Sequence, residues 1–304
     1  MMPTETIENE ERLIGWIERS LGAGARVERI ERALGATSSS VFFVDAARGG
    51  TRTELVARLF TIKEWLAEEP DLAVHEAQAL EAARGAGLHC PRLLAYAEDS
   101  TACGAPAVLM SREAGSVELP SVRDGLRLSA MASSLAEIHA SSASIPWSYV
   151  SWTRRERLSV PVWTRRPELW RRALEVRSLG PKPYVPVFIH RDFHPVNLLW
   201  LDGRISAVVD WVNACLGPRG ADVAHCMGNL ALMFGASAAD AFLDAYRAGA
   251  PGYDHDPYWN IDWILGTLPE PEYYRPWVEF GLPPLSQEEL KDRLEEHLAR
   301  AVAS

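Results

Sequence analysis

The sequence predicts an α+β protein in two parts, a small antiparallel sheet that carries one helix and a larger, mainly helical region. Two runs rich in β-branched and aromatic residues meet at the pair Gly49-Gly50, which indicates a hairpin. A helical pattern then separates two more short apolar runs, and helical spacing dominates from Ser121 onward. We therefore expect two lobes, over residues 1–113 and 114–304.

The elements of the first lobe follow from local patterns. The run from Val41 to Val44 suits a strand because β-branched and aromatic side chains fit a pleated surface. Ala73, Ala77 and Leu80 share one face of a helix. In order, we expect a helix over 7–21, strands over 41–44 and 54–60, a helix over 71–86, and strands over 91–96 and 107–110.

The second lobe shows helical spacing for most of its length. Leu128, Met131 and Leu135 recur at helical intervals, whereas residues 147–186 have little periodicity. Ser286 stands three residues before Glu289, which is the pattern of a capping box. Further helices are expected over 222–234, 238–248 and 286–303.

Composition narrows the classes of partner. The 304 residues include 41 acidic and 31 basic ones, a formal charge of -10, and a negative protein repels nucleic acid and anionic lipid. No signal-peptide pattern and no run of 18 apolar residues is present. Four cysteines without a Cys-x-x-Cys pair are expected to be buried thiols in a reducing compartment. We therefore expect a cytoplasmic protein with neither nucleic acid nor membrane as partner.

The most informative segment covers residues 188–211. Two apolar runs flank Asp202-Gly203, a strong signal for a two-residue hairpin turn. This turn places Asn197 opposite Val208 and predicts that Asn197 and Asp210 are diagonal neighbours, with Cα atoms about 7–8 Å apart. Two short oxygen-bearing side chains at that distance can bind one hard cation.

Asp192 lies just upstream, in a stretch that Pro195 keeps from continuing as a helix. An aspartate beside two oxygen ligands suits Mg²⁺, which holds few protein ligands and keeps positions for phosphate oxygens. Phosphoryl transfer needs one aspartate that orients the substrate hydroxyl and accepts its proton. It also needs an amide and a second carboxylate that bind the metal ion.

The amino-acid sequence of this segment resembles that of the aminoglycoside phosphotransferase family of kinase-like small-molecule phosphotransferases. The matching letters are HRDFHPVNLLW and AVVDWVNACLGPRGADVAH, with Trp211 directly after the second aspartate as in that family. Upstream, LVARLF, HEAQALEAARGAGLHCPRLLA and ACGAPAVLMSREAG extend the similarity over about residues 30–250. The resemblance implies a bilobal protein-kinase-like fold, with a nucleotide-binding first lobe and a catalytic and substrate-binding second lobe.

The resemblance also implies residue roles. Asp192 matches the catalytic base, and Asn197 with Asp210 matches the Mg²⁺ ligands. Arg58 stands where kinases place a lysine that touches the α- and β-phosphates, and Glu76 matches its ion-pair partner.

Further nucleotide contacts follow from the same resemblance. Residues 35–40, Ser39 among them, occupy the place of the phosphate-covering loop. Met110 and Arg112 belong to a hinge whose backbone would bind adenine. The implied activity is Mg²⁺-dependent transfer of the γ-phosphoryl group of ATP or GTP to a hydroxyl group of a small molecule.

Two other functions stay open on the sequence alone. One is a catalytically silent nucleotide-binding relative of these kinases. The other is a metal-dependent hydrolase, whose ligands are His190, Asp192, His194, Asp210 and His225.

The acceptor is not specified by a motif. An acidic region would suit a polycationic aminoglycoside, and macrolides, other antibiotics, sugars, amino alcohols and choline-like metabolites are alternatives, so antibiotic resistance is one possible role. Its members are Asp254, Asp256, Asp262, Glu270 and Glu272. Trp259 and Trp263, close to these acids, are expected to face a pocket. His139 and His225 are expected to be ordinary core or boundary histidines, and Asp222 a helix N-cap or a structural residue near the catalytic loop.

Overall fold

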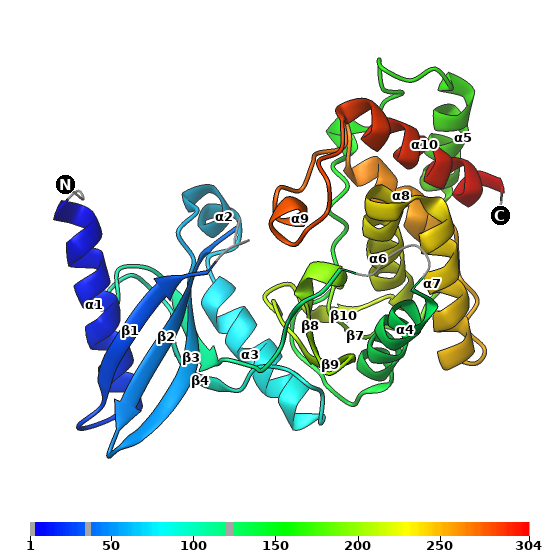
Figure 1. Cartoon of the computed structure of the whole chain (residues 1–304). Coiled ribbons are helices and arrows are strands. Elements are labelled where there is room, and N and C mark those ends of the chain that lie inside the picture. Colours follow the sequence, from blue (N-terminus) through cyan, green and yellow to red (C-terminus); the bar gives the residue numbers. More distant parts are fainter. Residues whose placement is uncertain (1–3, 34–37, 120–123, 304) are drawn as a thin grey trace. The chain divides into compact units, whose positions relative to one another are not determined.

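The computed structural model describes residues 4–33, 38–119 and 124–303. The chain forms two compact units (Figure 1). The first comprises Met1–Ala114 together with the short segment Ala207–Asn213, and the second comprises Gly115–Ser206 and Ala214–Ser304. The segment that carries Asp210 therefore belongs to the first unit, although it lies far along the chain.

The first unit contains a five-stranded antiparallel sheet in the order β1-β2-β3-β5-β4. Its elements are α1 (Thr4–Leu21), β1 (Arg26–Arg32), β2 (Ser40–Arg48), β3 (Thr51–Leu59), α2 (Lys63–Glu68), α3 (Leu72–Gly85), β4 (Leu93–Ala97) and β5 (Ala107–Ser111). Leu13 and Ile17 of α1 pack with Val44 and Leu55 of the sheet in one apolar core.

Strand β1 and helix α2 are absent from the pattern-based prediction. Five of the seven residues of β1 are charged, and most of its side chains are exposed, so no alternation of apolar residues marks it. It is an edge strand that pairs only with β2, where charged side chains discourage pairing with other chains. The rest of the sheet has the expected order of elements, and the fold class is α+β as predicted.

The second unit is mainly helical and also contains a two-stranded sheet (β10-β7) and a three-stranded sheet (β6-β8-β9). Its elements are β6 (Ser116–Val117), α4 (Gly125–Ala140), η1 (Arg155–Arg157), α5 (Pro167–Leu179), β7 (Val187–Ile189), η2 (Pro195–Asn197), β8 (Leu198–Leu201), β9 (Arg204–Val208), which runs into the first unit, β10 (Cys215–Gly217), α6 (Arg219–Phe234), α7 (Ala236–Gly249), α8 (Tyr258–Gly266), α9 (Pro276–Glu279) and α10 (Gln287–Ala303). Helix α6 is almost wholly buried and packs against α7, α8 and α10.

Two predicted local features are confirmed. Asp202 and Gly203 join β8 to β9 with φ angles of 51° and 74°, so both adopt the left-handed conformation of a type I′ turn. At α10, the Ser286 hydroxyl accepts a hydrogen bond from the Glu289 amide (3.2 Å), while Glu289 Oε2 accepts from the Ser286 amide (2.8 Å). This reciprocal pair is the capping box.

All four cysteines are buried and free. In the part of the chain that is described, no helix has both the length and the apolar character that a membrane crossing needs.

Candidate active site

Asp192 lies in the loop between β7 and η2, and a buried carboxylate on α6 holds this loop. The Asp222 carboxylate accepts hydrogen bonds from the backbone N–H groups of His190 (2.7 Å) and Arg191 (2.5 Å). Arg191 has a φ of 69°, a left-handed conformation that is unfavourable for a residue with a side chain. Asp222 is also bound by the His139 ring at 3.1 Å. Because α6 begins at Arg219, Asp222 is not an N-cap; it anchors the loop, which agrees with the structural role that the resemblance implied.

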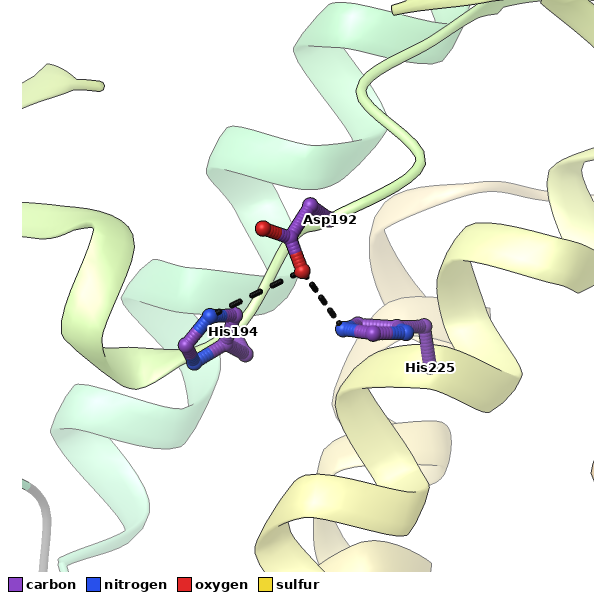
Figure 2. A group of neighbouring side chains, drawn as sticks. All are labelled: Asp192, His194 and His225. Atoms are coloured by element: carbon purple, nitrogen blue, oxygen red, sulfur yellow. Dashed lines mark ion pairs between the residues drawn. The ribbon is translucent and has the colours of Figure 1, made fainter. Parts of the chain in front are cut away.

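Three side chains surround the Asp192 carboxylate, and Figure 2 shows two of them, His194 and His225. His225 Nε2 lies 3.0 Å from Asp192 Oδ1, and His194 Nε2 lies 3.7 Å from the same oxygen. Asn197 Nδ2 donates to Asp192 Oδ2 at 3.2 Å and to its backbone carbonyl at 2.9 Å. The side chain of Asp192 keeps 24% of its surface exposed, so the carboxylate is held on both oxygens and still open to solvent.

The partners of His225 fix the position of its proton. Trp263 Nε1 lies 3.1 Å from His225 Nδ1, and an indole N–H can only donate. His225 Nδ1 must therefore accept, which places the proton of the neutral ring on Nε2. Nε2–H then donates to Asp192. His225 is thus a largely buried histidine with a partner on each ring nitrogen, as expected of a core or boundary histidine, and one of these partners is the carboxylate predicted to act as the base.

The Asp192 carboxyl is ionised at neutral pH. Burial opposes its ionisation, but the hydrogen bond from His225 and the neighbouring imidazoles outweigh burial and hold the pKa of Asp192 below its usual range. An ionised carboxylate that accepts two fixed hydrogen bonds can orient a hydroxyl group and receive its proton.

Asp192, His194 and His225 also form a cluster whose ligand atoms lie within 4.8 Å of one another. A metal ion bound by His225 Nε2 would require the ring proton on Nδ1, where it would face the N–H of Trp263. This conflict argues against a metal ion in the cluster and against the hydrolase reading of these residues.

A second cluster lies in the first unit, around Arg58 at the end of β3. Arg58 Nη1 lies 2.9 Å from Glu76 Oε1 on α3 and 2.5 Å from Asp210 Oδ1, and Arg58 Nε donates to Ser39 Oγ at 2.9 Å. The side chains of Arg58 and Glu76 are only 5% and 2% exposed, whereas that of Asp210 is 29% exposed. The structure thus brings together four of the residues that the sequence singled out for nucleotide and metal binding.

Charge balance holds this cluster together. Burial lowers the pKa of the Arg58 guanidinium, but the carboxylates of Asp210 and Glu76 outweigh burial and raise its pKa above the usual value. Arg58 is therefore a permanent cation between two acids. Asp210 has a φ of 67°, so the ion pair holds a strained residue in place.

The predicted hinge lies at the end of β5. Met110 is buried within the sheet, opposite Val56 and Leu93. The backbone N–H of Arg112 already donates to the Glu54 carbonyl at 3.2 Å, and its guanidinium lies 4.1 Å from the ring centre of Phe43. A nucleotide base would have to use other backbone groups of this segment or replace that bond. Of the predicted phosphate loop, residues 34–37 lie outside the described residues.

Known proteins resemble this chain in sequence and in fold. Residues 29–259 match the model of the phosphotransferase enzyme family APH. A homoserine kinase of Methylocella silvestris is 28% identical over 226 residues, which cover 65% of this chain and 69% of that protein.

Solved structures share the fold at low sequence identity. A thermostable mutant of the aminoglycoside phosphotransferase APH(4)-Ia, in a ternary complex with ADP and hygromycin B, superposes with a TM-score of 0.61 and 16% identity, covering 99% of this chain and 98% of that chain. The amicoumacin kinase hAmiN, in complex with AMP-PNP, Ca²⁺ and Ami, gives a TM-score of 0.64 and 12% identity, covering 98% and 94%.

The fold is therefore that of the kinase-like phosphotransferases, a sheet-rich N-terminal part followed by a helical one. The family model matches most of the chain, so the protein belongs to the phosphotransferase enzyme family. It is a small-molecule kinase with a hydroxyl group as acceptor, as the resemblance in the catalytic segment implied.

The sequence analysis grouped His225 with Asp192 only as possible metal ligands of a hydrolase, and it missed His225 as a hydrogen-bond donor to that carboxylate. One signal was present: His225 follows Asp222 by three residues on the same helix, so the two side chains share a face. A residue one turn from the side chain that anchors the Asp192 loop is a candidate for contact with that loop.

Proposed function

We propose that the protein transfers the γ-phosphoryl group of ATP or GTP to a hydroxyl group of a small molecule, with Mg²⁺ as the cofactor. The observation that supports this best is the fixed, ionised and partly exposed carboxylate of Asp192, held by Asn197 and His225. In phosphoryl transfer the protein mainly positions groups and balances charge, and a carboxylate of this kind meets the need for an acceptor of the hydroxyl proton.

Asp192 aligns the acceptor hydroxyl and takes its proton as the new P–O bond forms and the bond to the leaving nucleotide breaks. Its pKa below the usual range keeps it ionised before the reaction. His225 and Asn197 each donate to one of its oxygens, so the carboxylate does not need to reorganise during the step.

The donor chemistry of Asn197 and Asp210 fits Mg²⁺. The two hydrogen bonds from the Asn197 side chain to Asp192 are both donated by Nδ2. They do not involve the side-chain oxygen Oδ1, which is a hard ligand atom that suits Mg²⁺. Arg58 engages Oδ1 of Asp210 and leaves the second oxygen to a cation. When bound, Mg²⁺ would neutralise charge on the nucleotide phosphates.

Arg58 and Ser39 are proposed to contact the phosphates. A guanidinium can grip phosphate oxygens in a bidentate manner, and the Glu76 carboxylate keeps Arg58 in position. The backbone around Met110 and Arg112 is proposed to bind the nucleotide base.

Asp192→Asn tests the proposal. We expect it to abolish formation of phosphorylated product, detected by mass spectrometry across a panel of hydroxyl acceptors, while calorimetry shows nearly unchanged binding of the nucleotide. Asp202→Asn is the matched control, because it makes the same change at a turn residue with a left-handed backbone that asparagine tolerates. An Asp192→Asn variant that keeps more than a tenth of the wild-type rate would remove Asp192 from this role.

Asp210→Ala tests the metal assignment separately. We expect weaker binding of Mg²⁺-nucleotide in calorimetry, since a proposed ligand and a partner of Arg58 are lost together. Unchanged affinity would contradict the assignment of Asp210.

A further inference from the structure

A pocket of about 170 Å³ lies in the second unit, next to the catalytic loop. Four aromatic side chains line it, those of Tyr149, Trp152, Trp259 and Trp263. An apolar cavity of about 150 Å³ is large enough to bind one benzene molecule. The pocket itself therefore has room for about one ring-sized group.

The aromatic wall is built into the packing of α6 against α8. A Cβ atom at Gly220 would lie 2.1 Å from Trp259, and one at Gly228 would lie 2.3 Å from Trp263. Glycine inside a helix costs about 1 kcal/mol relative to alanine. The two glycines on α6 thus leave the space that the indole rings of Trp259 and Trp263 occupy. These rings form one side of the pocket.

The pocket lacks free negative charge. Asp262 is the one carboxylate among its lining residues, and its Oδ1 lies 2.5 Å from Nε of Arg177. The other oxygen of Asp262 accepts a hydrogen bond from the Ser151 hydroxyl at 2.7 Å. The Asp262 side chain is 5% exposed and already neutralised, so it offers little to a cation.

The neighbouring acids are engaged as well. Asp254 pairs with the ammonium group of Lys182 at 3.0 Å, and Glu270 pairs with that of Lys291 at 3.2 Å. Asp256 accepts a hydrogen bond from the backbone of Lys182 at 2.7 Å. Four of the five acids that suggested a polycationic acceptor thus have a partner within the protein.

Arg191 supplies the opposite charge. Its guanidinium lies 4.2 Å from the ring centre of Trp152 and donates to the Val150 carbonyl at 2.5 Å. Among the described residues no carboxylate lies within ion-pair distance of it, and its buried Nε has no hydrogen-bond partner. The pocket therefore presents a cation without a protein counter-charge.

We propose, on the basis of the function proposed above, that this pocket binds the acceptor through one ring-sized apolar group carrying an anionic substituent that pairs with Arg191. The lining connects directly to the reaction centre. Arg191 precedes Asp192 in the chain, and His225 both lines the pocket and donates to Asp192. The hydroxyl of an acceptor seated here faces the carboxylate that the proposed function makes the base.

Three para-substituted benzyl alcohols that share one ring and one hydroxymethyl group, and carry a negative, a neutral or a positive substituent, test the charge preference. They are 4-(hydroxymethyl)benzoate, 4-methylbenzyl alcohol and 4-(aminomethyl)benzyl alcohol, and calorimetry measures the affinity of each for the full chain. We expect the carboxylate to bind at least tenfold more tightly than the methyl compound, and the amine to bind most weakly. Arg191→Gln should remove the advantage of the carboxylate and change the affinity for the methyl compound less than twofold.

Trp152→Ala is a second variant of the pocket that should stay folded, because Trp152 is 46% exposed and does not belong to the core. It should weaken the methyl compound at least fivefold, because it removes part of the wall, whereas Arg191→Gln should leave that affinity within twofold. Equal affinities for the three compounds, or tighter binding of the amine or of hygromycin B than of the carboxylate, would overturn the proposal.

The two proposals can fail separately. If another acceptor is phosphorylated in an Asp192-dependent manner while the carboxylate does not bind, the pocket proposal is wrong and the proposed function stands. If the carboxylate binds as expected and no acceptor is phosphorylated, the binding inference holds without the proposed activity.

Discussion

Removal of the His225 side chain is the sharpest perturbation of the candidate site. In His225→Leu, Asp192 Oδ1 loses the hydrogen bond that it now receives at 3.0 Å, while the bond from Asn197 to Oδ2 remains. A hydrogen bond to a charged group contributes about 1.5–3 kcal/mol. Because each 1.36 kcal/mol corresponds to a factor of ten in rate, kcat should fall about 10- to 100-fold.

The loss should appear in kcat and leave the KM for the nucleotide unchanged, since Arg58 and its partners belong to the other unit. His225→Gln is the matched variant, because its amide can donate to Asp192 and accept from Trp263. Steady-state kinetics of the two variants should show most of the activity restored in His225→Gln. A His225→Leu enzyme with more than half of the wild-type kcat, or a glutamine variant no better than leucine, would refute the reasoning.

The tautomer of His225 has its own measurement. Nitrogen-15 NMR of the wild-type ring should show a neutral imidazole with the proton on Nε2, because the Trp263 indole faces Nδ1 at 3.1 Å. In Trp263→Phe that donor is gone, but the ionised Asp192 carboxylate can only accept, so Nε2–H should remain the main form. A wild-type ring with its proton on Nδ1 would show that the assigned hydrogen-bond directions are wrong.

Other changes have equally specific outcomes. Arg58→Met leaves two acids without their buried cation, so chemical denaturation should show a loss of about 3–5 kcal/mol, and a loss below 1 kcal/mol would count against the cluster. Burial lowers the pKa of His255 and of His297 to about 4. Below pH 6.5 the unfolded chain therefore binds more protons than the folded one. As the pH falls from 6.5 to 4, the free energy of unfolding should decrease by up to about 3 kcal/mol per histidine. This decrease should be smaller in His297→Gln, which lacks one of the two histidines. Gly115→Ala should lower the melting temperature, because its Cβ would lie 2.6 Å from the Trp200 carbonyl oxygen at a φ of 117°.

Features of the fold that depend on neighbouring residues could be predicted from the sequence. The Asp202-Gly203 turn and the capping box at Ser286 need only a few adjacent residues, and both are present. Strand β1 could not be predicted, because it is specified by pairing with β2 and not by its own charged sequence. Helix α8 was not predicted either. Its two tryptophans, Trp259 and Trp263, do line a pocket as expected.

The candidate site shows the same division. The family resemblance pointed to Asp192 and also to Arg58 with Glu76, which the structure places 2.9 Å apart. His225 could not be assigned, since its contact with Asp192 joins residues 33 positions apart and depends on how α6 packs beneath the loop. A motif specifies the side chains that carry the chemistry, and tertiary packing selects the ones that hold them.

Two strained residues of the candidate site show why local sequence patterns could not predict its geometry. Arg191 and Asp210 both adopt a left-handed backbone, with φ angles of 69° and 67°, at a cost of about 1–3 kcal/mol each. Such conformations persist only where the surroundings determine them. The Asp222 carboxylate holds the amide of Arg191, and the Arg58 guanidinium holds the carboxylate of Asp210. Each holder is a buried charge on a distant element, so the backbone next to the proposed chemistry is set by long-range electrostatics that no local pattern encodes.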